Sequence, residues 1–310
     1  MTIYIVSSGV SSNGLTLGSG NEMELLSGGT VTGTIVNSGG EVLVSATGTA
    51  DATTLNFRGA LQVSPGGLAS GTVVNSGAVE VVSVGGIDSA ATVNAGGEFL
   101  VSGGTADGSL ISGITVVFTG GAANGATVEN GGNLWLSGGS TSGATLNDAV
   151  LNVYAGGNAE ATQAANTGTI YVSSGGQIND TGLTGRGNAV VYQGGTAIST
   201  TVNVSGALIL MGGTASNTLL SSGGQLADLS GGSAANTIVN SGAIIEINGG
   251  SVTDLQIQLG GAIDLAALAD DGVGSATLNS SNDVRPNSLM QDLLCQYPQV
   301  PVLGTEGSGR

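Results

Sequence analysis

One stretch of about 19 residues recurs along almost the whole chain and limits what this chain can fold into. Its clearest copy runs from Ser64 to Gly86, SPGGLASGTVVNSGAVEVVSVGG. A Gly pair precedes a short β-branched segment, a turn at Asn75–Gly77 separates that segment from a second apolar one, and another Gly pair ends the copy. Two turns and two short strands cannot bury a hydrophobic face alone, whereas stacked copies can. The repeat therefore predicts a stack of coils.

Two independent series of turns keep this period. The strand-closing turns recur every 17 to 19 residues from Val10 to Gly250, and the other turn recurs in phase from Gly20 to Gly260. Strands that stack coil on coil in one direction are parallel, and the rest of each coil supplies the crossover. We therefore predict an all-β fold, a right-handed parallel β-solenoid of about 14 coils of 17–20 residues with two strands per coil. The hand follows from the general chirality of parallel crossovers.

Three columns of residues indicate how one coil sits on the next. The first column is apolar and precedes the second turn: Val36, Leu55, Val74, Val93, Leu110, Val128, Leu146, Leu220, Val239 and Ile257. The second holds apolar pairs of period 2, which point to one face, the interior: Val42/Val44, Leu61/Val63, Phe99/Val101, Leu134/Leu136, Ile170/Val172 and Leu208/Leu210. The third is Asn at the turn, where stacked amides are expected to form a hydrogen-bonded ladder: Asn37, Asn56, Asn75, Asn94, Asn147, Asn166 and Asn240.

The repeat fades near residue 268, and the composition changes after Asp283. We assign residues 1–268 to a β-solenoid repeat domain and residues 269–310 to an exit loop, a short capping segment and a disordered tail. The capping segment begins at Pro286 and is expected to form a short amphipathic helix. Such a helix would cover the open sheet edge of the last coil.

Charge and composition exclude several classes of function. With 4 Lys and Arg against 21 Asp and Glu, the net charge is −17, so neither nucleic acid nor an anionic membrane surface is expected as a partner. The chain has no His and one Cys, Cys295, which excludes catalytic triads and zinc sites. No apolar run is long enough for a membrane helix, and the first residues lack the basic region of a signal peptide. We expect no cofactor and no metal.

The acidic residues offer little for catalysis. Asp51, Asp88, Asp107, Asp148, Asp180, Asp228 and Asp254 are separated by at least a coil, and we interpret them as isolated surface acids. A glycoside hydrolase needs two carboxylates close together. We therefore predict a non-enzymatic protein. The alternative is a carbohydrate-binding or carbohydrate-active β-helix that uses surface carboxylates.

The residues between the inward pairs of the second strand must point outward. They are Leu43, Gln62, Glu80, Leu100, Trp135, Asn152, Tyr171, Val191, Ile209 and Asp264. A contiguous apolar patch on a protein surface usually marks an interface. We therefore expect a self-association stripe made of the six apolar or aromatic members: Leu43, Leu100, Trp135, Tyr171, Val191 and Ile209. Its expected partner is a second copy of the chain or a cell-surface polymer. A rival ice-binding hypothesis rests on a column of Thr34, Thr53, Thr72, Thr218 and Thr237, which neighbouring Thr residues do not continue in register.

The repeat resembles the strand-loop-strand repeat of AIDA-type autotransporter passengers, on the evidence of TVTGTIVNSGGEVLVSATG (Thr30–Gly48) and GGSAANTIVNSGAIIEINGG (Gly231–Gly250). The resemblance covers roughly Ile3 to Leu268. It implies a bacterial cell-surface or extracellular protein that acts in adhesion, autoaggregation and biofilm formation. It also implies a glycosyltransferase as partner, since some members carry heptose on such loops. The matching hydroxyls are Ser27, Thr30, Ser102, Thr105, Ser137, Ser140, Ser230 and Ser233.

Overall fold

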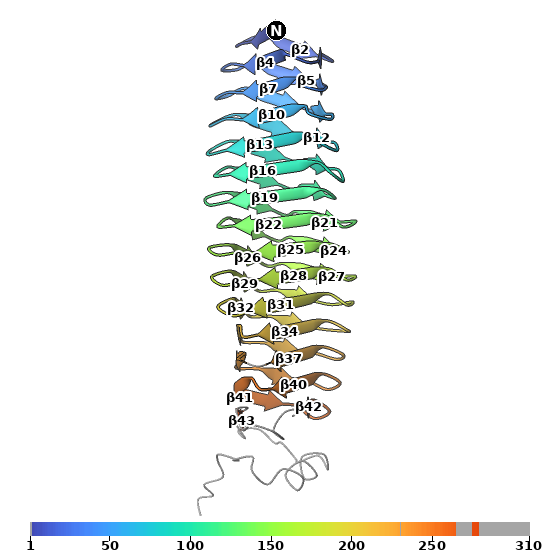
Figure 1. Cartoon of the computed structure of the whole chain (residues 1–310), viewed down its shortest axis with the longest axis vertical. Helices are drawn as coiled ribbons and strands as arrows, with labels where there is room; N and C mark the ends of the chain where they lie inside the picture. The colour runs from blue at the N-terminus through green and yellow to red at the C-terminus, as the bar shows by residue number, and fades with distance from the viewer. Residues whose placement is uncertain (1, 230, 265–274, 279–310) are drawn as a thin grey trace, which may run out of the picture. The chain divides into compact units, whose positions relative to one another are not determined.

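A computed structural model describes residues 2–229, 231–264 and 275–278, and all the regular elements among these residues are β-strands. They fall into two compact units, residues 1–163 with 168–170 and residues 164–167 with 171–310. Each unit is a parallel β-solenoid whose strands stack in chain order (Figure 1). Together the units account for about 14 coils. The predicted all-β parallel β-solenoid is confirmed, while its handedness stays a prediction.

The long strands form one wall of each solenoid. In the first unit they are β1 (Thr2–Val6), β4 (Asn21–Leu25), β7 (Glu41–Val44), β10 (Ala60–Val63), β13 (Val79–Ser83), β16 (Glu98–Ser102), β19 (Ile114–Phe118), β22 (Asn133–Ser137) and β25 (Val150–Val153). In the second unit they are β31 (Asn188–Tyr192), β34 (Ala207–Met211), β37 (Gln225–Leu229), β40 (Ile244–Asn248) and β42 (Ala262–Asp264). Strand β28 (Thr169–Val172) contains residues of both units.

Three-residue strands form a second wall. They are β2 (Ser11–Asn13), β5 (Thr30–Thr32), β8 (Thr49–Asp51), β11 (Leu68–Ser70), β14 (Ile87–Ser89), β17 (Thr105–Asp107), β20 (Ala122–Asn124), β23 (Ser140–Ser142) and β26 (Asn158–Glu160), with β29 (Gln177–Asn179), β32 (Thr196–Ile198), β35 (Thr214–Ser216) and β38 (Ser233–Ala235) in the second unit. Within each unit these strands pair in parallel with the equivalent strands of the neighbouring coils.

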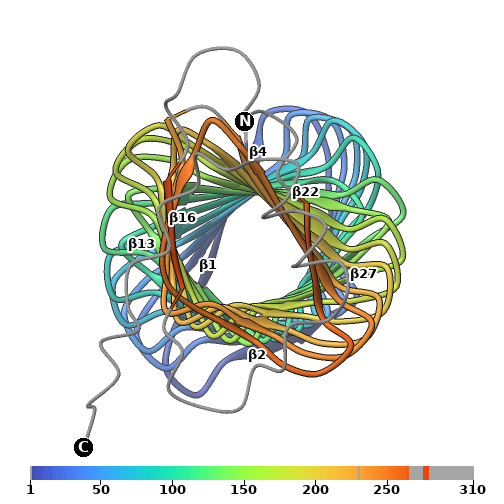
Figure 2. The same cartoon turned by 90° about the horizontal axis from the view of Figure 1, so that it is seen from below.

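The third wall consists mostly of two-residue strands. They are β3 (Thr16–Leu17), β6 (Ile35–Val36), β9 (Thr54–Leu55), β12 (Val73–Val74), β15 (Thr92–Val93), β18 (Leu110–Ile111), β21 (Thr127–Glu129) and β24 (Thr145–Asn147), then β30 (Gly182–Leu183), β33 (Thr201–Val202), β36 (Leu219–Leu220) and β39 (Ile238–Val239) in the second unit. Strand β27 (Gln163–Ala165) contains residues of both units, and β41 (Ser251–Ile257) runs through both short-strand walls. Seen along the stack, strands of successive coils overlie one another (Figure 2).

The structure thus divides the first of the two predicted strands of each coil into two short strands. The division falls at a residue with left-handed backbone, such as Gly33 (φ 65°) or Ala52 (φ 50°). The Gly33 N–H donates to the carbonyl of Asp51 in the next coil at 2.9 Å, so the bend does not interrupt the ladder. Gly adopts this conformation readily, and Ala does so at a cost in strain.

The Gly pair at the end of each long strand serves two separate purposes. Gly28 has φ +73° in a turn in which the Gly29 N–H donates to the Leu26 carbonyl at 2.9 Å. A Cβ on Gly29 would overlap the carbonyl oxygen of Val6 in the preceding coil. The first Gly is therefore required by backbone conformation and the second by the close approach of two coils.

The interior is built from the columns that the sequence predicts, with one change. All the predicted inward pairs of the long strands are buried, as are Val36, Leu55, Val74 and Val93 on the short strands. Leu110, predicted in this column, is 37% exposed, and Ile111 is buried in its place. Ile111 is the residue in register with Val93, because this coil is shorter than its neighbours.

Asparagine amides link four consecutive coils. Asn56 donates to Asn37 at 2.9 Å, Asn75 to Asn56 at 3.0 Å, and Asn94 to Asn75 at 2.8 Å. Asn147 pairs in register with Glu129 rather than with another Asn. Asn166 has left-handed backbone, and Asn240 occupies a turn slot between those of Ser221 and Gln258. An amide ladder needs Asn in adjacent coils, which only the run from Asn37 to Asn94 provides among the predicted members.

The predicted exit loop contains a further strand, because β43 (Ser275–Leu278) pairs in parallel with β41. The predicted capping helix and tail lie outside the described residues, so the proposed division at residue 268 stays a prediction.

The buried apolar column supplies a test of this packing. We expect Val74→Asp to destabilise the fold by about 3–5 kcal/mol, because Val74 is 0% exposed between Leu55 and Val93 and the new carboxylate would have no partner. Val73→Asp, one residue earlier on β12 and half-buried, is the matched control and should cost much less. Equal losses in thermal melting for the two variants would contradict the assignment of inward and outward faces.

Candidate functional site

The outward side chains of the long strands form the candidate site. Backbone pairing places one middle row along the first unit: Glu24, Leu43, Gln62, Val81, Leu100, Val116, Trp135 and Asn152. In the second unit the same row consists of Val190, Ile209, Ala227, Glu246 and Asp264. Successive side chains of a strand alternate between faces, so this row lies opposite the buried pairs.

Most residues predicted for the stripe do face outward. Leu43, Leu100, Trp135, Tyr171 and Ile209 are half-buried on the outer side of their strands. Tyr171 stacks on Tyr192 in the second unit, with ring centroids 6.3 Å apart and ring planes at 23°.

Two residues predicted to face outward point inward instead. Val191 is 0% exposed and pairs in register with buried Leu210, so its assignment to the stripe was wrong and Val190 takes its place. Glu80 is also 0% exposed, between Leu61 and Phe99, while Val81 faces outward. A count of 19 residues from Leu61 to Glu80, or back from Leu210 to Val191, would have found both positions.

Apolar residues cluster in this outward surface on both units. We define the first-unit face as Val79, Val81, Leu100, Ile114, Val116 and Trp135. We define the second-unit face as Tyr171, Val190, Tyr192, Ile209 and Met211, of which Tyr192 is 38% and Met211 47% exposed. Phe118 and Tyr154, at the edge of the first-unit face, are 39% and 40% exposed.

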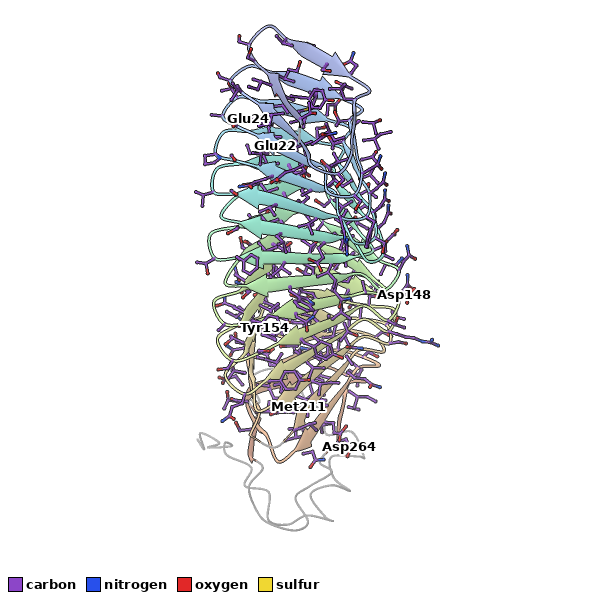
Figure 3. The ribbon with its side chains drawn as sticks, turned by 45° about the horizontal axis from the view of Figure 1, so that its top comes forward. Glu22, Glu24, Asp148, Tyr154, Met211 and Asp264 are labelled. Carbon is purple, nitrogen blue, oxygen red and sulfur yellow. The ribbon has the colours of Figure 1, made fainter. Side chains whose placement is uncertain are left out.

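Charge is nearly absent from these faces. From β10 to β25 the only acidic outward residue of the long strands is Glu98, and the described outward residues of β31, β34 and β37 include none. Acids return on the strands before and after, with Glu22 and Glu24 on β4 and Asp264 on β42 (Figure 3). For a chain of net charge −17, this is a marked local exclusion of acids.

Three acids predicted at the surface lie in the interior. Glu80 and Asp88 are both 0% exposed, and the Thr72 hydroxyl donates to Asp88 Oδ2 at 3.4 Å. Burial, with the neighbouring Asp88 charge, raises the pKa of Glu80 well above its usual range, and burial raises the pKa of Asp88 to about 6. Burial also raises the pKa of Asp228 to about 7. None of the three can serve as the surface carboxylate of the carbohydrate-active alternative.

The predicted glycan acceptors differ in accessibility. Ser27, Ser102 and Ser137, the first residues of their loops, are exposed, whereas Thr30, Thr105, Ser140 and Ser233 are half-buried. The Thr30 hydroxyl lies 2.9 Å from that of Ser11, and the Ser140 hydroxyl donates to the Gly121 carbonyl at 3.4 Å. Ser230 lies outside the described residues. The exposed serines are the hydroxyls that an enzyme could reach.

Other site classes find little support among the described residues. The Thr column of the ice-binding hypothesis is buried, with Thr34, Thr53, Thr72 and Thr237 at 0% and Thr218 at 1% exposure, so that hypothesis is wrong for this column. In the part of the chain that the structure describes, no group of three or more Asp, Glu, His or Cys side chains is placed to hold a metal ion. No helix there is long and apolar enough to cross a membrane.

Comparisons with known proteins agree with this architecture. The model of the AIDA family, described as "Adhesin of bacterial autotransporter system, probable stalk", matches residues 203–261. Among solved structures, a hyper-glycosylated fragment of TibA, modified by TibC, is 34% identical to this chain. The match covers 86% of this chain and 99% of the fragment, with a TM-score of 0.66. The chain belongs to the family of AIDA-type autotransporter passengers. A cell-surface or extracellular location follows from that membership.

Other matches carry no argument about function. The fluoroquinolone-resistance protein QnrB1 is 12% identical, over 92% of this chain and 98% of its own, with a TM-score of 0.20. An endo-xylogalacturonan hydrolase from Aspergillus tubingensis is 14% identical, over 91% of this chain and 90% of its own, with a TM-score of 0.17. No curated protein matches the chain in sequence.

The corrected register of β31 in this passenger can be tested with two adjacent valines. Val191→Ser should destabilise the fold by about 2–4 kcal/mol, because it removes a buried side chain and buries a hydroxyl. Val190→Ser, on the outer side, should cost about 1 kcal/mol or less. Midpoints of denaturant unfolding measure the difference, and the reverse order would restore the original assignment.

Proposed function

We propose that this passenger is a non-enzymatic adhesive module that associates with further copies of itself through the first-unit face and the second-unit face. The observation that carries the proposal is the absence of acids from these faces on a strongly acidic chain. Two acidic chains repel each other unless they meet where charge is missing. Apolar and aromatic side chains then gain by leaving water.

The size of each face suggests weak contacts. At about 4.8 Å between strands and about 3.3 Å per residue, the four strands β13, β16, β19 and β22 present roughly 300 Å². A stable interface buries about 800 Å² per partner. A single face is therefore expected to associate reversibly, and two faces per chain, multiplied over many chains on one cell surface, would raise the avidity.

Sedimentation velocity tests self-association. The variant carries Leu100→Ser, Trp135→Ser, Tyr171→Ser and Ile209→Ser, which replace two outward residues on each unit. We expect concentration-dependent association of the wild type and its loss in this variant.

The matched control replaces four apolar residues of the short-strand walls by Ser: Ile35, Leu68, Ile87 and Leu110, which are 40%, 43%, 42% and 37% exposed. The control should associate like the wild type. A wild type that is monomeric at all accessible concentrations, or equal losses in both variants, would refute the proposal. A monomeric wild type that binds a cell-surface polymer through the same residues would replace a second copy by that polymer.

We further propose that the exposed loop serines accept glycans from a glycosyltransferase of the TibC kind. The support is the 34% identical TibA fragment, which is glycosylated, and the exposure of Ser27, Ser102 and Ser137. The half-buried hydroxyls one turn further on are less accessible to an enzyme.

Intact mass after co-expression with a heptosyltransferase tests this proposal. Mass increments of whole heptose units are expected on the wild type, and fewer on Ser27→Ala/Ser102→Ala/Ser137→Ala. Thr30→Ala/Thr105→Ala/Ser140→Ala serves as the control and should keep most of them. A wild type without increments would mean that these loops are only turns, for which Ser and Thr are also well suited.

A further inference from the structure

Two carboxyl groups are enclosed in one coil of the first unit. Glu80 occupies an inward position of β13, and Asp88 occupies an inward position of β14 later in the same coil. Both side chains are 0% exposed. Burial of an ionised carboxylate in an apolar interior is expensive unless a partner compensates for it.

The surroundings supply no compensating cation. Glu80 lies between Leu61 and Phe99 on the neighbouring long strands, and Asp88 lies between Ala69 and Ala106 on the neighbouring short strands. The other charged group that acts on Asp88 is Asp107, another acid at the end of β17. The chain contains no Lys, and the two described arginines, Arg58 and Arg186, are exposed.

A proton is therefore needed between the two groups. Asp88 receives hydrogen bonds from the Thr72 hydroxyl and the Ala91 backbone N–H, whereas neither Glu80 oxygen has a donor among the described residues. A hydrogen bond between the two carboxyls raises the pKa of Glu80 and lowers that of Asp88, which assigns the proton to Glu80. Ionised carboxylates only accept hydrogen bonds, so this contact exists only in the protonated form.

We propose that Glu80 and Asp88 share a proton that keeps this coil closed, and that loss of the proton opens the solenoid locally at β13 and β14. The pair would thus make this segment a pH-sensitive element within an otherwise uniform stack. Local opening of one cooperative segment, without global unfolding, is common in proteins.

The direction of the effect follows from proton linkage. In the unfolded chain both acids ionise near their usual pKa values of about 4, whereas in the folded coil burial raises both pKa values, that of Asp88 to about 6. Between these values the closed coil holds protons that the open coil releases. The stabilisation is therefore complete at acidic pH and is lost as the pH rises through the folded pKa values, by about tenfold in the opening constant per pH unit for each proton held.

Hydrogen–deuterium exchange with mass spectrometry measures this opening in the intact chain. After correction for the intrinsic exchange rate, we expect protection in peptides that cover residues 79–93 to fall about tenfold per pH unit between about pH 5 and 7 in the wild type. Glu80→Gln and Asp88→Asn should each abolish most of this dependence. The matched control Glu98→Gln removes one exposed acid from the neighbouring strand β16 and should keep it.

A second measurement needs no variant that has to fold. Infrared spectra of the folded wild type at neutral pH should contain a C=O band of a buried, protonated carboxylic acid that resists exchange. Asp228, the other buried acid with a raised pKa, also contributes, so the comparison is made in an Asp228→Asn background.

Three results would overturn the proposal. Protection of residues 79–93 that does not change with pH would show that the coil does not depend on the proton. An unchanged pH dependence in both Glu80→Gln and Asp88→Asn would assign the effect to other groups. Protection restored at neutral pH by added Ca²⁺ or Mg²⁺ would identify the pair as a cation site instead.

Discussion

The whole structure depends on backbone hydrogen bonds between residues one coil apart in each unit. The Asn56 N–H donates to the Val36 carbonyl at 2.8 Å, and the Asn75 N–H donates to the Leu55 carbonyl at 2.9 Å. Every coil must therefore repeat the path of the coil before it at the spacing of neighbouring strands. That constraint fixes which residues face inward, which glycines cannot be replaced, and which side chains meet in columns. Side chains contribute energy to this arrangement but do not choose its register.

The dominance of the backbone register explains both what the sequence predicts and what it does not. The turns, the inward pairs and the run of asparagines from Asn37 to Asn94 follow from the period alone. The errors at Leu110 and Val191, and the outward placement of Glu80, arose where local hydropathy was followed in place of the period. In VEVVS, the pattern of apolar residues favours Val79 and Val81 as the inward pair, yet the flanking turns place Glu80 and Val82 there. The bend at Gly33 and its equivalents also carried a signal, a recurring slot for Gly, Ala, Asn or Asp.

The candidate site shows a different limit of sequence reasoning. The outward row was predictable because it is the complement of the inward one, but its breadth was not. The first-unit face joins Val79 and Ile114, which come from a second outward row, to the middle row that includes Leu100 and Trp135. Neighbours of this kind become visible only when the strands are placed side by side. Accessibility of the loop hydroxyls likewise depends on coil-to-coil contacts, such as the one between Ser11 and Thr30.

The Gly pair has a consequence for how such a chain can change in length. Because Gly29 closes on Val6 in the same way as Gly67 closes on Val44, the contact surface between coils is nearly the same at every step. A whole repeat can then be gained or lost by recombination within the gene, and the coils on either side still fit each other. Substitution at the second Gly has no such freedom. Evolution of this solenoid is therefore permissive in the number of coils and restrictive within each of them.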